Sequence, residues 1–105
     1  MADAASLGAP NPWHPITDPL KLKILGKLAE ELGECGSAVA RCIIQGIDEV
    51  EPVTGKPNRK WLEDEVADAI ANLQIAIEKL NLDGRAIGVR IEMKKRHLST
   101  WHELT

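Results

Sequence analysis

Residues 19–45 read PLKLKILGKLAEELGECGSAVARCIIQ, and this stretch decides the fold. Its apolar residues recur every three or four positions, the spacing at which side chains share one face of an α-helix. Asp18 before Pro19 is a helix-start signal, and Gly46 is a stop signal. The stretch therefore predicts one long amphipathic helix. Its apolar seam comprises Leu25, Leu28, Leu32, Cys35, Val39 and Cys42.

An acidic cluster, Glu30-Glu31-Leu32-Gly33-Glu34, lies in the middle of this helix. Glu31 and Glu34 are three residues apart and share a face, whereas Glu30 is turned nearly opposite the seam. Like charges this close destabilise an exposed helix by roughly a few tenths of a kcal/mol, so the cluster raises the question of a neutralising cation. Gly33 and Gly36 cost about 1 kcal/mol each relative to alanine, which predicts close approach of another backbone.

A second amphipathic helix is expected from about Asn58 to Asn81, with Asn58 as its cap. The helix has an apolar stripe and, beside it, a polar stripe that carries carboxylates. Residues within the polar stripe are three or four positions apart. The apolar stripe comprises Leu62, Val66, Ala69, Ile70, Leu73, Ile77 and Leu80, and the polar stripe comprises Trp61, Glu65, Asp68 and Asn72. Residues 47–58, before this helix, read as a loop because prolines and a glycine interrupt them.

A third, shorter helix is expected from a cap at Asp83 to about His97. Basic residues gather on it, including Lys94, Lys95 and Arg96, and cations are favoured near a helix C-terminus by the helix dipole. Three such helices leave apolar surface uncovered, so we expect an all-α antiparallel helical bundle completed by homo-oligomerisation, as a homodimer or a homotetramer.

Composition limits the classes of function. The 105 residues make one domain, residues 17–105, preceded by an extended N-terminal arm, residues 1–16, which is rich in proline. A net charge of -3 and a pI near 5.6 argue against binding to nucleic acid polymers or membrane surfaces. The sequence lacks a signal peptide pattern and a membrane-spanning run, so a cytoplasmic location is expected. Cys35 and Cys42, about 10.5 Å apart along one helix, cannot bridge each other within that helix and are expected to be buried thiols.

The two carboxylate pairs predict a possible cation site. Glu31 with Glu34, and Glu65 with Asp68, converge if the two helices pack antiparallel, and oxygen ligands suit Mg²⁺ or Mn²⁺. The pairs contain no histidine, which disfavours a di-iron site, and they lie within helices, which disfavours an EF-hand. Spacing alone leaves open that these are ordinary solvated helix faces.

Two motifs resemble the signature of the MazG-like all-α nucleoside triphosphate pyrophosphohydrolases, in the dCTP pyrophosphatase/MazG branch. They are Glu30-Glu31-Leu32-Gly33-Glu34 and Glu65-Val66-Ala67-Asp68, within a similarity that runs from about Leu25 to the C-terminus. The interval between the motifs is longer than is usual in that family, which places an extended loop around Pro52 to Pro57.

The resemblance implies cleavage of an NTP or dNTP between its α and β phosphates, giving a nucleoside monophosphate and pyrophosphate, with Mg²⁺ as cofactor and Mn²⁺ as a possible substitute. Glu31, Glu34, Glu65 and Asp68 are then the expected catalytic metal ligands, with Glu30 in a supporting role. Expected substrate contacts are Asn72, Lys94, Lys95, Arg96 and Trp61. Two alternatives remain: a non-catalytic oligomerisation or nucleotide-binding regulatory module of the same fold, and a hydrolase of another phosphorylated metabolite.

Overall fold

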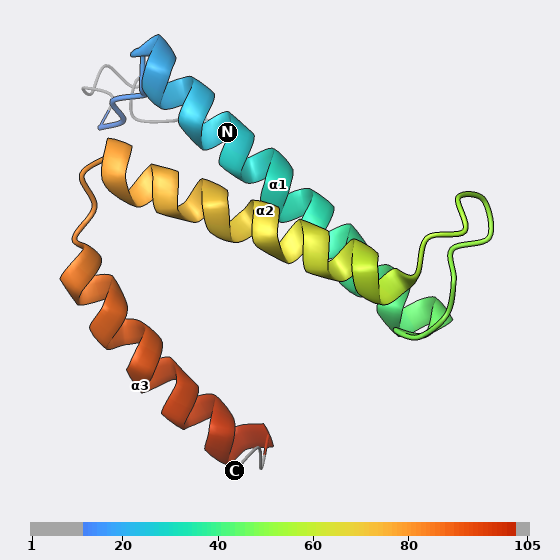
Figure 1. Cartoon of the computed structure of the whole chain (residues 1–105). Helices are drawn as coiled ribbons and strands as arrows, with labels where there is room; N and C mark the ends of the chain where they lie inside the picture. Colours follow the sequence, from blue (N-terminus) through green and yellow to red (C-terminus); the bar gives the residue numbers. More distant parts are fainter. Residues whose placement is uncertain (1–11, 103–105) are drawn as a thin grey trace, which may run out of the picture.

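The computed structural model describes residues 12–102, and within that range the chain forms three helices and no strand (Figure 1). Helix α1 spans Pro19–Gln45, α2 spans Asn58–Lys79 and α3 spans Gly84–His102. The all-α prediction is confirmed, although α3 continues past the expected end at His97. Residues 12–18 carry no helix, and the remainder of the predicted arm, residues 1–11, lies outside the described residues. Over residues 12–102, no helix combines the length and the apolar character that a membrane span requires.

Both ends of α1 follow the sequence signals. Asp18 accepts hydrogen bonds at Oδ1 from the backbone N–H groups of Leu20 at 2.9 Å and Lys21 at 3.4 Å. At the other end, the N–H of Gly46 donates to the carbonyl of Cys42 at 2.9 Å. Gly46 has a φ of 109°, a conformation that side chains disfavour, so glycine suits this helix end.

The start of α2 differs from the prediction, because Asn58 is not the cap. Pro57 occupies the capping position and makes no side-chain hydrogen bond. The Asn58 side chain instead donates from Nδ2 to Gln45 Oε1 at 3.1 Å and to the carbonyl of Gly46 at 3.0 Å. Carbonyls at a helix C-terminus lack helical donors, and Asn58 supplies one. This fully buried side chain therefore ties the start of α2 to the end of α1.

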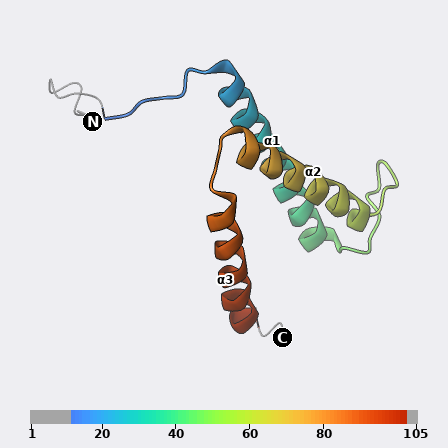
Figure 2. The ribbon, with the colours of Figure 1, turned by 60° about the vertical axis from the view of Figure 1, so that its left-hand side comes forward.

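Helices α1 and α2 pack antiparallel and side by side, whereas α3 diverges from the pair (Figures 1 and 2). The buried apolar residues among those described are three alanines, Ala38, Ala69 and Ala76. Such small side chains let two helix backbones approach closely. The predicted seams are only partly covered, since Leu32 is 46% exposed and Ile70 is 49% exposed. The buried line of α1 runs instead through Glu31 and Ala38, rotated from the expected seam.

Uncovered apolar surface continues from the helix pair onto α3. A groove of about 440 Å³ is lined by residues of all three helices and of the turn before α3, including Leu28, Leu73, Leu82 and Ile91. Completion of the bundle by self-association stays a prediction. The expectation for Gly33 and Gly36 is not met among the described residues, because a Cβ at either glycine would find no atom of another helix or loop within 4 Å.

Candidate functional site

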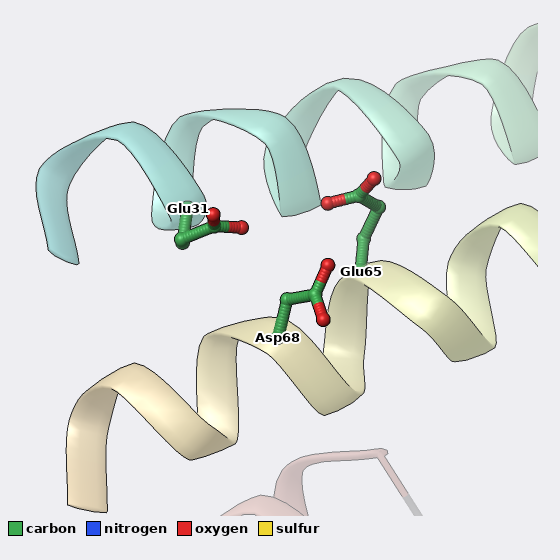
Figure 3. A group of neighbouring side chains, drawn as sticks. All are labelled: Glu31, Glu65 and Asp68. Carbon is green, nitrogen blue, oxygen red and sulfur yellow. The ribbon is translucent and has the colours of Figure 1, made fainter. Parts of the chain in front are cut away.

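Three of the predicted ligand carboxylates come together between α1 and α2. Glu31 projects from α1, while Glu65 and Asp68 project from α2, and their carboxylates point toward one another (Figure 3). One carboxylate oxygen from each residue lies within 4.8 Å of the others. Glu65 and Asp68 share a helix face because they are three residues apart, and antiparallel packing sets Glu31 opposite them. We call these three residues the carboxylate triad.

Glu31 is the buried member of the triad, at 7% exposed. Its Oε1 pairs with Lys27 Nζ at 3.1 Å, but its Oε2 is buried and has no hydrogen-bond partner. Glu65 Oε2 is likewise buried without a partner. Buried carboxylate oxygens are costly unless a donor or a cation satisfies them. The set of oxygen donors therefore fits a hard divalent cation such as Mg²⁺ or Mn²⁺, and these residues could hold one.

Glu34 lies beside the triad rather than within it. It is exposed, and its pKa is raised above the ordinary value, first by the negative charge of Glu31 and then by desolvation and the charges of Glu65 and Glu30. A neighbouring negative charge raises a carboxyl pKa because it disfavours the ionised form. The prediction that Glu34 is a ligand stays a prediction. Glu30 is exposed, and its Oε1 lies 3.5 Å from Lys27 Nζ; its supporting role stays a prediction.

A pocket of about 380 Å³ adjoins the triad. Its lining includes Glu34, Ser37 and Arg41 from α1 and Trp61 and Glu65 from α2. Trp61 thus faces the pocket, on the same side of α2 as Glu65. Sequence reasoning missed Ser37 and Arg41. Their spacing could have identified them, since residues three and seven positions beyond Glu34 lie on the same helix face as Glu34.

The indole of Trp61 is flanked by two cations. Arg41 Cζ lies 5.4 Å from the ring centroid, and Lys56 Nζ, from the loop before α2, lies 4.0 Å from it. Lys56 also forms an ion pair with Asp64 at 2.7 Å. The sequence did not identify Lys56, because the loop gives no periodic pattern that would place its side chain.

The remaining predicted substrate contacts are not assembled by one chain. Asn72 Nδ2 donates to the carbonyl of Asp68 in its own helix at 2.8 Å, so this amide is partly used locally. Lys94, Lys95 and Arg96 are exposed on α3, which diverges from the α1–α2 pair (Figure 2). Within a single chain these three residues are not brought to the triad.

Comparison of the chain with protein-family models, curated proteins and solved structures finds no match. The function of the site is therefore inferred from its own residues. These are a buried carboxylate facing two others across a helix pair, and a pocket beside them with a carboxylate end and a cationic, aromatic end.

Proposed function

We propose that the chain is a metal-dependent nucleoside triphosphate pyrophosphohydrolase, which cleaves an NTP or dNTP to a nucleoside monophosphate and pyrophosphate. The observation that carries the proposal is the buried Glu31, which has one unpartnered oxygen, Oε2, and whose carboxylate lies beside those of Glu65 and Asp68. The motif resemblance described above supports the same activity. Mg²⁺ or Mn²⁺ at this position would neutralise phosphate oxygens and lower the pKa of an attacking water.

The residues of the chain have separate tasks in this proposal. Glu31, Glu65 and Asp68 hold the cation, and Glu34, which lines the adjoining pocket together with Glu65, extends the set of oxygen ligands. Lys27 holds Glu31 through Oε1, and Glu31 Oε2, which has no partner, would be available to a cation. The packing of α1 against α2 brings Glu31 to Glu65 and Asp68 before substrate arrives.

A panel of NTPs and dNTPs tests the activity, with pyrophosphate release measured with and without Mg²⁺ or Mn²⁺. We expect release from at least one substrate, only with metal. Glu65→Gln and Asp68→Asn should each reduce the rate by about a hundredfold or more. Replacing a residue that only hydrogen-bonds a metal ligand already reduces metal affinity or activity by about 10–100-fold, and these two residues are proposed as ligands themselves. Glu63→Gln is the matched control, because Glu63 is exposed on α2 and outside the triad.

A thermal unfolding experiment gives a second readout. Mn²⁺ should raise the Tm of the parent chain and of Glu63→Gln, but not that of Glu65→Gln, because a ligand bound to the folded state stabilises it. A chain that hydrolyses no member of the panel at high protein concentration would contradict the proposed activity.

The uncovered apolar groove favours one alternative, a helical oligomerisation or nucleotide-binding regulatory module. This alternative predicts nucleotide binding without turnover. It also predicts that self-association is unchanged in Glu65→Gln and Asp68→Asn. Turnover by the parent chain, lost in these two variants, would favour the enzyme over this alternative.

A further inference from the structure

The pocket beside the triad changes chemical character along α1. Glu34, Ser37 and Arg41 line it in that order, so a carboxylate, a hydroxyl and a guanidinium follow one another on a single helix face. Arg41 is seven residues beyond Glu34, about 10.5 Å along the helix axis at 1.5 Å per residue. The pocket therefore has an anionic end suited to cations and a cationic end suited to anions.

Among the described residues around the pocket, Arg41 is a cation that forms no ion pair with a carboxylate within 4 Å. Lys27, Lys56, Arg59 and Lys60 each form an ion pair with a carboxylate within 4 Å. Over residues 12–102, Arg41 forms no hydrogen bond and no ion pair within 4 Å. Its charge is attracted to that of Glu51 over a longer distance. Its guanidinium rests over the Trp61 ring, which fixes its position while leaving its N–H donors available.

Charge decides which part of a substrate would occupy the cationic end. A base and a sugar are neutral, whereas the pyrophosphate part of a triphosphate carries most of its negative charge. Several carboxylates already surround the site, so the phosphates need positive charge beyond that of the bound cation. A guanidinium also matches phosphate oxygens with two parallel hydrogen bonds.

We infer that Arg41, positioned by the Trp61 ring, binds the pyrophosphate part of the substrate and the pyrophosphate product. This assignment rests on the proposed function and adds a substrate-contacting residue to it. Trp61 acts here as a platform for the guanidinium, and the Ser37 hydroxyl lies between Arg41 and the carboxylates on the same face of α1.

Calorimetric titration of pyrophosphate in the presence of Mg²⁺ tests the assignment without requiring turnover. Arg41→Gln should weaken pyrophosphate binding by about tenfold to a hundredfold, the worth of a hydrogen bond to a charged group. Binding of the nucleoside monophosphate product should change less than about twofold. Arg41→Lys should recover only part of the loss, because lysine keeps the charge but not the paired donors.

Arg59→Gln is the matched control, since it removes the same charge from a nearby residue that is paired with Asp48. Circular dichroism of each variant checks folding, and Arg41→Lys provides the comparison if Arg41→Gln is unfolded. Unchanged pyrophosphate binding in Arg41→Gln, a selective loss of monophosphate binding, or no pyrophosphate binding by the parent chain would overturn the inference. Pyrophosphate binding without hydrolysis of any nucleotide would contradict the proposed function and leave the role of Arg41 in place.

Discussion

Replacement of Asn58 by alanine tests how the two packed helices are joined. The side chain of Asn58 is fully buried and donates from Nδ2 to Gln45 Oε1 at 3.1 Å and to the Gly46 carbonyl at 3.0 Å. Its backbone N–H donates to the Glu49 carbonyl at 2.9 Å, and alanine would keep this bond. Asn58→Ala therefore removes the side-chain connection between the end of α1 and the start of α2 while leaving the backbone connection intact.

The expected loss of stability follows from these contacts. Each hydrogen bond contributes about 1 kcal/mol, and the Gly46 carbonyl would lose its side-chain donor. Asn58 Oδ1 is buried without a partner, so its removal returns part of this loss. The net destabilisation should be about 1–2 kcal/mol. Asn58→Asp should cost more at neutral pH, because it keeps the shape but directs a carboxylate at two acceptor oxygens.

Urea unfolding followed by circular dichroism, at one fixed protein concentration, measures these differences. Gln45→Ala is the control, because it removes only the bond to an exposed acceptor and should cost about 0.5 kcal/mol or less. A change below about 0.5 kcal/mol for Asn58→Ala would refute the reasoning, as would an Asn58→Asp variant more stable than the alanine variant.

Two further predictions concern the loop and the apolar groove. The pKa of Glu51 is lowered, first by its hydrogen bond from the Thr54 hydroxyl and then by the N–H groups of Val53 and Thr54. Glu51 therefore stabilises the fold above its ordinary pKa of 4.5, and this stabilisation is lost as pH falls through the lowered value. Glu51→Gln should lower Tm at neutral pH but not at a pH below the lowered value, and an equal deficit at both would contradict this. Separately, light scattering should give the chain a mass above 11.5 kDa, and Ile91→Glu, but not the exposed loop change Val53→Glu, should reduce it. A parent chain of 11.5 kDa would contradict self-association.

The helices were predictable because local signals determine them. Asp18 and Gly46 mark the two ends of α1 as expected. At the start of α3, Asp83 Oδ1 accepts a hydrogen bond from the N–H of Ala86. Asn58 misled the prediction because asparagine suits both a cap and a tertiary hydrogen bond. Only the folded junction reveals that the end of α1 offers two acceptors to the buried amide, the Gly46 carbonyl and Gln45 Oε1.

The site was predictable in part. Spacing places Glu65 and Asp68 on one face of α2, and the structure brings Glu31 to them, because α1 and α2 pack antiparallel. Which face of α1 is buried could not be read from its apolar residues, since Leu32 is exposed and the neighbouring Glu31 is buried. Arg41 was missed because its contact with Trp61 depends on the register between the two helices, which the sequence does not give.

The core of the helix pair explains how a carboxylate comes to be buried there. A pair sealed by large aliphatic side chains would hold its helices further apart, whereas Ala38, Ala69 and Ala76 allow the close contact that brings Glu31 to the α2 carboxylates. Close packing removes water from Glu31, and Lys27 satisfies only one of its oxygens. The folded chain therefore carries a local electrostatic cost that a divalent cation would relieve, so cation binding and the stability of the helix pair are expected to rise together.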